Sequence, residues 1–164
     1  MNSLATNPIP PASDALDSRQ VSLTTRRTKV LVADDDPAIR ESLRHALESE
    51  NFEVILAADG NEALEKFHEG YIDIVLLDLK MPGKSGWEVF ERMTAVNPLL
   101  AVIIITARNG AVELAAEAGA TAIMEKPLDL PTLLWTIHRL LREPLERRLW
   151  RIAAHCPLIM SSER

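Results

Sequence analysis

Five short apolar runs, each followed by a segment of helical periodicity, divide residues 29–141 into a regular alternation. The runs are continuous rather than interrupted by polar residues, which is typical of strands buried on both faces. They cover residues 30–33, 54–57, 72–77, 101–105 and 121–124. After the first run, apolar residues recur at helical spacing from Ile39 to Leu47. Because alternating strands and helices form parallel sheets with right-handed crossovers, we predict an α/β fold with an open, doubly wound, five-stranded sheet.

The segments outside this alternation differ from it in composition. Residues 1–28 contain three prolines among small polar residues and lack an apolar period, so we predict a flexible N-terminal arm. Residues 29–142 are expected to form the folded domain. Residues 143–164 are expected to form a C-terminal tail, in which Leu145, Leu149 and Ile152 have the spacing of a short extra helix.

Negative charge is concentrated in the predicted domain. The whole chain has a net charge of −6, whereas residues 29–141 alone carry −9, because both flanking segments are positive. An acidic domain repels nucleic-acid phosphates and favours a metal cation or a basic partner, so we expect no direct nucleic-acid binding. The longest apolar stretch, residues 99–105, is too short to cross a bilayer, and the single cysteine cannot form an internal disulfide. With no secretory signal pattern at the N-terminus, we expect a cytoplasmic location and no membrane partner.

Polar residues that can bind ligands or take part in catalysis follow four of the predicted strands. Asp34 and Asp35 end the first strand, Asp78 ends the third, and Thr106 and Lys126 end the fourth and fifth. A doubly wound sheet brings the carboxyl ends of its strands to one edge, where ligands bind. Three carboxylates at close range favour a hard divalent cation, of which Mg²⁺ is the common choice. Together with a lysine and a hydroxyl, this group suits phosphoryl transfer.

Four sequence runs carry a family resemblance. VLVADDD at residues 30–36, LLDLKMPG at 76–83, ITA at 105–107 and EKP at 125–127 resemble the receiver domain of bacterial two-component response regulators. The resemblance covers roughly residues 28–142, and four runs in the right order make it specific. It implies a flavodoxin-like (βα)5 fold with strand order 2-1-3-4-5. It also implies a signalling switch that catalyses only its own phosphorylation and dephosphorylation.

The resemblance assigns a role to each residue of the predicted site. Asp78 would accept a phosphoryl group from a sensor histidine kinase or a histidine phosphotransfer protein. Asp34 and Asp35, with Asp78 and the backbone carbonyl of Lys80, would bind Mg²⁺. Thr106 and Lys126 would contact the phosphoryl group, and the peptide bond between Lys126 and Pro127 would be cis.

Two features depart from the family pattern. Ile123 occupies the position, three residues before the lysine, where many receivers carry a switching Tyr or Phe. The stretch from Thr106 to Lys126 is also slightly shorter than is common in the family. We therefore expect an intact phosphorylation site with an altered readout.

The output of such a switch is left open by the sequence. The 22 residues after Arg142 are too few for a helix-turn-helix output domain, so we expect a stand-alone receiver whose output is an unknown protein partner, self-association or a phosphorelay. Trp135 lies on the last predicted helix, opposite its apolar stripe and beside Arg139, which suggests an interface for a homodimer. Folding back of the C-terminal tail over Trp135 is the equally weighted alternative.

Two further functions compete with the receiver interpretation. Residues 34–36 also resemble the paired-aspartate motif of haloacid-dehalogenase-like phosphatases, in which Asp34 would be the nucleophile, although Ala38 stands where that motif has Thr or Val. The chain is short for such an enzyme. The second alternative is an interaction module in which phosphorylation is vestigial. Asp36 is predicted to cap the following helix in any of these cases.

Overall fold

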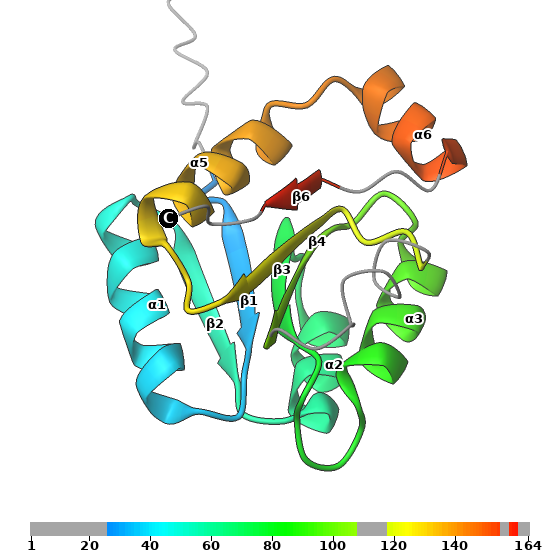
Figure 1. Cartoon of the computed structure of the whole chain (residues 1–164). Coiled ribbons are helices and arrows are strands. Elements are labelled where there is room, and N and C mark those ends of the chain that lie inside the picture. The colour runs from blue at the N-terminus through cyan, green and yellow to red at the C-terminus, as the bar shows by residue number, and fades with distance from the viewer. Residues whose placement is uncertain (1–25, 108–117, 155–157, 161–164) are drawn as a thin grey trace, which may run out of the picture.

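A six-stranded parallel sheet in the order β2-β1-β3-β4-β5-β6 forms the centre of the protein (Figure 1). The structure is a computed structural model and describes residues 26–107, 118–154 and 158–160. The strands are β1 (Lys29–Ala33), β2 (Glu53–Ala57), β3 (Ile74–Asp78), β4 (Ala101–Ala107), β5 (Ala122–Lys126) and β6 (Leu158–Met160). The described helices are α1 (Pro37–Ser49), α2 (Gly60–Glu69), α3 (Gly86–Val96), α5 (Leu130–Leu141) and α6 (Leu145–Ala154).

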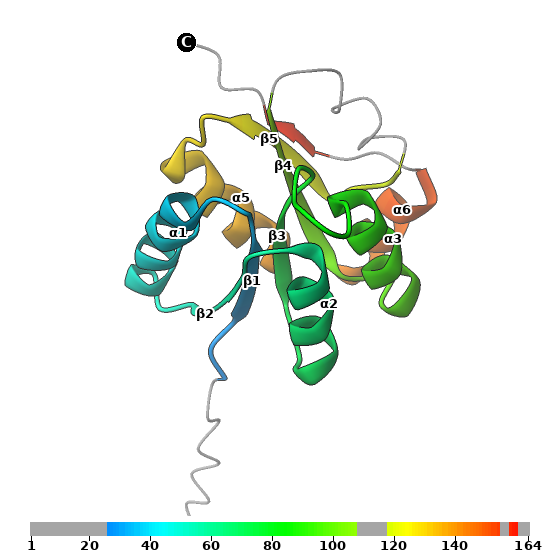
Figure 2. The same cartoon turned by 90° about the horizontal axis from the view of Figure 1, so that it is seen from below.

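Helices cover both faces of the sheet, which explains why the strand sequences are apolar throughout (Figure 2). Alternate residues of each strand point to opposite faces. Leu31 and Leu77 pack with α2 and α3 in one buried cluster. Val32 and Leu76 pack with α1 and α5 in the other. Neither face of the central strands is left for solvent, so a continuous apolar run is what this sheet requires.

The helices begin at the residues that the sequence indicates. Asp36 caps α1 by accepting hydrogen bonds from the backbone N–H groups of Ala38 and Ile39. Ser85 caps α3 by accepting from the N–H of Glu88. A side-chain oxygen at this position satisfies backbone donors that the helix itself leaves unpaired. The predicted capping role of Asp36 is confirmed.

The predicted strand order 2-1-3-4-5 is confirmed, and the sheet continues beyond it. The short strand β6, near the C-terminus, pairs in parallel with β5, in the register Ala122↔Leu158 to Met124↔Met160. The sequence analysis did not predict this strand. The helical segment expected between the fourth and fifth strands falls largely on residues 108–117, which lie outside the described part of the chain.

The C-terminal segment also forms a helix, as its leucine spacing suggested. The helix α6 follows α5 after residues 142–144, and Arg148 ties it to the end of α5 by donating to the backbone carbonyl of Leu140 at 3.2 Å. Among the described helices, none has the length and apolar character needed to span a membrane.

Candidate functional site

The carboxyl ends of the strands bring the predicted site residues to one edge of the sheet. β1 and β3 are direct neighbours, with Ala33 paired to Leu77, so the residues that follow and end them lie together. On the other side of β3, Asp78 pairs with Ile105 of β4, and Ala107 of β4 pairs with Lys126 of β5. This topology assembles residues that are up to 92 positions apart in the sequence.

Three carboxylates form the centre of the site. Each of Asp34, Asp35 and Asp78 offers an oxygen, and these oxygens all lie within 4.8 Å of one another. Asp34 and Asp78 are buried, with 0% and 4% of their surface exposed, whereas Asp35 is exposed. The predicted convergence of these aspartates is therefore found in the structure.

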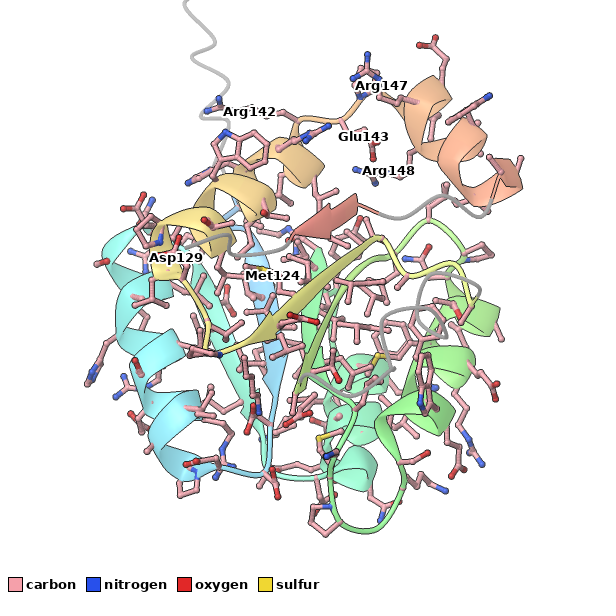
Figure 3. All side chains as sticks on the ribbon, in the orientation of Figure 1. Met124, Asp129, Arg142, Glu143, Arg147 and Arg148 are labelled. Carbon is pink, nitrogen blue, oxygen red and sulfur yellow. The ribbon has the colours of Figure 1, made fainter. Side chains whose placement is uncertain are left out.

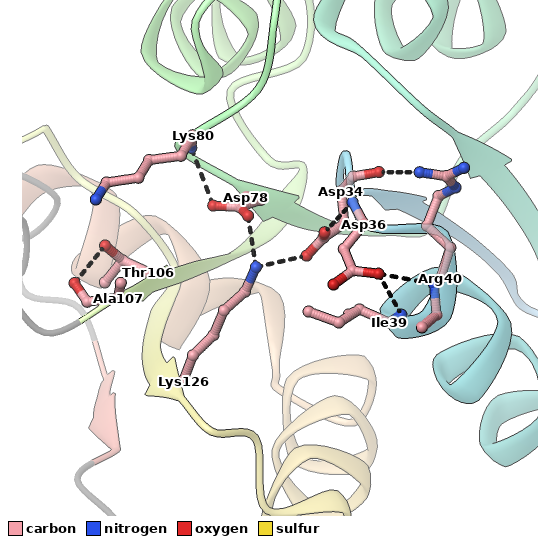
Figure 4. A network of polar contacts seen from close by, with 10 residues as sticks. Asp34, Asp36, Ile39, Arg40, Asp78, Lys80, Thr106, Ala107 and Lys126 are labelled. Carbon is pink, nitrogen blue, oxygen red and sulfur yellow. Dashed lines mark hydrogen bonds and ion pairs between the residues drawn. The ribbon is translucent and has the colours of Figure 1, made fainter.

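Lys126 connects two of these carboxylates (Figure 4). Its Nζ donates to Oδ2 of Asp78 at 2.5 Å and to Oδ2 of Asp34 at 2.8 Å. The peptide bond between Lys126 and Pro127 is cis, as the family resemblance implied. The ammonium group thus neutralises part of the charge that two buried carboxylates would otherwise hold at close range.

Backbone donors fix the orientation of the same two carboxylates. Oδ1 of Asp78 accepts from the N–H of Lys80 at 3.0 Å, and Oδ1 of Asp34 accepts from the N–H of Asp36 at 2.9 Å. Both contacts run from a residue to the backbone two positions later, so they are local turns at the strand ends. Each carboxylate is therefore held between a backbone N–H and the lysine ammonium.

Burial and charge act on the ionisation of the site in opposite directions. Burial raises the pKa of Asp34 above its ordinary value, and the nearby Asp78 charge adds to this, while the hydrogen bonds from Lys126 and the Asp36 N–H partly offset it. Burial alone would lower the pKa of Lys126. Its hydrogen bonds to Asp34 and Asp78 outweigh that effect, so the pKa of Lys126 lies above its ordinary value.

The remaining predicted residues surround this centre. Thr106 is buried at the end of β4, and its hydroxyl donates to the backbone carbonyl of Ala107 at 3.1 Å. The side chain of Lys80 is directed away from the carboxylates in Figure 4, whereas its backbone N–H donates to Asp78. Ile123 is buried in β5, within the cluster formed with α2 and α3.

Arg40 is a contributor that the sequence analysis missed. Its guanidinium donates to the backbone carbonyl of Asp34 at 2.6 Å and so holds the loop between β1 and α1 from the first turn of the helix. Position 40 is four residues after the Asp36 cap, which places it one turn above the loop. That spacing was visible in the sequence, but a surface arginine on a helix gives no signal that distinguishes this role.

The residues present fit a hard divalent cation. Three carboxylate oxygens in a small cluster match the oxygen ligands that Mg²⁺ prefers, and two of the three groups are buried, where uncompensated negative charge is costly. The single ammonium of Lys126 leaves excess negative charge among the three acids. A cation bound by Asp34, Asp35 and Asp78 would offset it.

Comparison with known proteins identifies the family. The family described as "Response regulator receiver domain" matches residues 30–138. The chain belongs to this family. Receivers are phosphorylation-controlled signalling modules rather than conventional enzymes, which removes the alternative of a haloacid-dehalogenase-like phosphatase with Asp34 as its nucleophile.

Relatives and solved structures agree with this assignment. The receiver is 40% identical over 116 residues to the response regulator MprA of Mycolicibacterium vanbaalenii, covering 70% of this chain and 50% of that protein. The match to MprA of Mycobacterium leprae is also 40% identical. The chain thus spans about half the length of the curated relatives that it matches.

Among solved structures, a CheY-like receiver from Methanospirillum hungatei JF-1 superposes with a TM-score of 0.68 at 29% identity, over 76% of this chain and 98% of that one. TrrA of Thermotoga maritima, solved in complex with Mg²⁺–BeF, superposes with a TM-score of 0.65 at 34% identity, over 69% of this chain and 98% of that one. The solved structures therefore match the chain over nearly their full length, in contrast to the longer curated relatives.

Proposed function

We propose that Asp78 is the phosphoacceptor of this receiver. The observation that supports it is the position of its carboxylate, which accepts a hydrogen bond from the Lys126 ammonium and shares an acidic cluster with Asp34 and Asp35 at the carboxyl edge of the sheet. An Asp78 oxygen attacks the phosphorus of a phosphohistidine, the P–N bond breaks, and the imidazole nitrogen retains the electron pair and then takes up a proton. The donor is a sensor histidine kinase or a histidine phosphotransfer protein of the cytoplasm.

The neighbouring residues have separate parts in this proposal. Asp34, Asp35 and Asp78, with the backbone carbonyl of Lys80, hold Mg²⁺, which when bound neutralises charge on the transferring phosphoryl oxygens. Lys126 stays protonated and contacts a phosphoryl oxygen, exchanging part of its interaction with Asp78. The hydrogen bond from the Thr106 hydroxyl to the Ala107 carbonyl breaks, and the hydroxyl donates a hydrogen bond to the phosphoryl group instead.

A cavity beside Lys126 offers a place for the phosphodonor protein to dock. It has a volume of about 370 Å³ and lies between α1 and the connection from β5 to α5. Its lining is mainly apolar, including Ile39, Leu43, Leu128 and Leu130. An apolar surface directly beside the phosphorylation site suits a protein donor better than a small phosphate ester.

Mass spectrometry of the intact protein tests the proposal. After incubation with acetyl phosphate and Mg²⁺, the wild type should gain one phosphoryl group, and Asp78→Asn should gain none. Asp35→Ala is the matched control, because it removes an acid from the same cluster but keeps the acceptor, and should be phosphorylated slowly rather than not at all. An adduct of undiminished yield on Asp78→Asn would overturn the assignment. If phosphorylation is vestigial, Asp78→Asn should bind its partner proteins as the wild type does.

A further inference from the structure

Arg40 holds the loop that carries two of the acidic residues against the helix that follows it. Its side chain is half-buried, and its Nη1 donates to the backbone carbonyl of Asp34 at 2.6 Å (Figure 4). Its backbone N–H donates to the carbonyl of Asp36 at 3.1 Å. Side chains on a helix tilt toward its amino end, so a long side chain at position 40 reaches back over the loop. Arg40 therefore holds the two carbonyl groups that flank Asp35, the exposed acid of the cluster.

The carboxylate of Asp35 depends on this backbone for its position. Asp34 is held at three points, because its N–H donates to the carbonyl of Ala57 at 3.2 Å, its carbonyl accepts from Arg40 and its carboxylate is hydrogen-bonded. By contrast, no hydrogen bond or ion pair joins the Asp35 carboxylate to another described residue. The contact from Arg40 to the peptide bond between Asp34 and Asp35 is thus the nearest restraint on the direction of the Asp35 side chain.

Charge alone does not explain an arginine at this position. A cation near the amino end of a helix is disfavoured by the helix dipole, and a cation beside a Mg²⁺ site repels the metal. Arg44, one turn later on α1, instead makes surface ion pairs with Glu41 and Glu48. Three other arginines lie on the side where α5 ends and α6 begins, away from the strand ends that carry the aspartates (Figure 3): Arg142, Arg147 and Arg148. The hydrogen bond to the loop is the feature that distinguishes Arg40.

A fixed carboxylate on α2 offsets part of the guanidinium charge. Oε2 of Glu62 accepts from the N–H of Ala58 at 2.6 Å, and its Oε1 accepts from Nζ of Lys66 at 2.5 Å. These hydrogen bonds, together with the charges of Lys66 and Arg40, hold the pKa of Glu62 below its ordinary value although burial opposes them. Glu62 is therefore ionised at neutral pH and weakens the repulsion between Arg40 and a cation in the acidic cluster.

We propose that Arg40 is a positioning residue for the Mg²⁺ site. By holding the carbonyl of Asp34 it fixes the peptide bond to Asp35, and with it the direction in which the Asp35 carboxylate meets the cluster. The inference rests on the proposed function, in which Asp34, Asp35 and Asp78 bind Mg²⁺. Residues that orient metal ligands without touching the metal commonly change its affinity by about tenfold or more. Loss of Arg40 should therefore weaken Mg²⁺ binding, although it removes a positive charge.

Calorimetric titration of the full chain with Mg²⁺ tests this role. Arg40→Met should bind Mg²⁺ about tenfold more weakly than the wild type, and Arg40→Lys, which keeps the charge and a donor, should recover most of the lost affinity. Arg44→Met is the matched control, because it removes the same side chain from the same helix and should bind as the wild type does. Binding by Arg40→Met as tight as the wild type or tighter would overturn the proposal, since the guanidinium would then act only through its charge. Equal losses in Arg40→Met and Arg44→Met would also overturn it.

Amide hydrogen exchange in EDTA reports on the loop without any metal. In Arg40→Met the N–H of Asp36, which donates to Asp34, should exchange faster than in the wild type, while the N–H of Leu77 in β3 should be unchanged. Unchanged exchange at Asp36 would contradict a positioning role. Unlike the phosphorylation assay, this measurement does not depend on the assignment of Asp78.

Phosphorylation by acetyl phosphate separates positioning from a general loss of structure. Arg40→Met should need about tenfold more Mg²⁺ for its half-maximal rate but reach the wild-type rate at saturating Mg²⁺. A lower rate at saturating Mg²⁺ with an unchanged half-maximal concentration would overturn the proposal. An adduct that persists on Asp78→Asn would instead overturn the proposed function, and the Mg²⁺ titration and hydrogen exchange would still decide the role of Arg40.

Discussion

Lys126 donates from Nζ to Oδ2 of Asp78 across 48 positions of the sequence, at a distance of 2.5 Å. The same ammonium also reaches Asp34, so one cation serves two buried carboxylates. The lysine stabilises the two carboxylates of the site, and in the proposed function it remains beside the acceptor when the phosphoryl group arrives. Its removal should therefore affect folding and chemistry separately.

We predict that Lys126→Met lowers the free energy of unfolding by about 2 kcal/mol at pH 7, because two buried carboxylates lose their cation. The difference should shrink at acidic pH as Asp34, whose pKa is raised by burial, becomes protonated. Since the pKa of Lys126 is raised, its stabilisation is present below the ordinary value of 10.5 and is lost only as the pH rises through the raised value. Urea unfolding across pH measures this. Lys80→Met, at an exposed lysine, should change stability by less than about 0.5 kcal/mol.

Asp34→Asn should stabilise the protein at pH 7 in the presence of EDTA. Because burial raises the pKa of Asp34, its ionisation costs stability as the pH rises from the ordinary value of 3.8 through the raised one. The neutral amide avoids this cost, and the pH dependence in that range should become shallower. A variant less stable than the wild type in EDTA at neutral pH would show that the ion pair with Lys126 dominates the cost of burial.

Asp35→Ala and Asp36→Ala should separate metal binding from helix capping. Asp35 offers an oxygen to the acidic cluster, so its loss should weaken Mg²⁺ affinity with little effect on stability. Asp36 caps α1, so Asp36→Ala should cost about 1 kcal/mol of stability and leave Mg²⁺ affinity nearly unchanged. Calorimetric titration with Mg²⁺ and thermal unfolding make the comparison. Equal Mg²⁺ affinity for Asp35→Ala and the wild type would contradict the ligand assignment.

Gly86→Ala should destabilise the protein by about 2 kcal/mol and slow phosphorylation by acetyl phosphate. A Cβ at Gly86 would lie 2.3 Å from the backbone oxygen of Asp78 and 2.6 Å from Cα of Leu79, and backbone at the end of a central strand cannot easily move aside. Gly70→Ala is the control, because no atom lies within 4 Å of its added Cβ, and it should be close to neutral. Similar unfolding curves for the two variants would refute the close packing of α3 on the strand end.

Trp135→Ala should weaken any self-association that the phosphoryl mimic beryllofluoride induces with Mg²⁺, by about tenfold. The indole is 53% exposed, and the guanidinium of Arg139 lies 5.1 Å from its ring centroid. The described residues of the C-terminal segment leave it open rather than folding over it. Analytical ultracentrifugation with and without beryllofluoride provides the measurement, with Trp150→Ala as the exposed-tryptophan control. Identical association of all three proteins in both states would exclude this face.

The five strands and the positions of the site residues at their ends could be predicted from local patterns in the sequence, whereas the order of the strands came from the resemblance to the receiver family. Apolar runs identify strands buried on both faces, and the strand ends then place Asp34, Asp78 and Lys126 at one edge. The hydrogen bonds made by the side chains around the site could not be predicted in this way. Whether the Thr106 hydroxyl bonds to Ala107, and whether Arg40 reaches the Asp34 carbonyl, depend on side-chain rotamers that no sequence spacing determines.

β6 escaped prediction for a different reason. Three residues are too few for a periodic signal, and residues 158–160 form a strand only because the edge of β5 is available to pair with them. Tertiary context thus decided the conformation of this segment, as is common for short strands at sheet edges.

The pairing of β6 with β5 also determines where this protein can be shortened. The family match ends at residue 138 and α5 at Leu141, so a cut after Leu141 would look natural from the family boundaries alone. Truncation after Leu141 would remove β6 from the sheet and leave unpaired N–H and C=O groups along one side of β5. Bare strands of this kind recruit other chains, so the shortened protein would aggregate for reasons unrelated to its signalling state. Expression that extends through Met160 retains the strand that protects it.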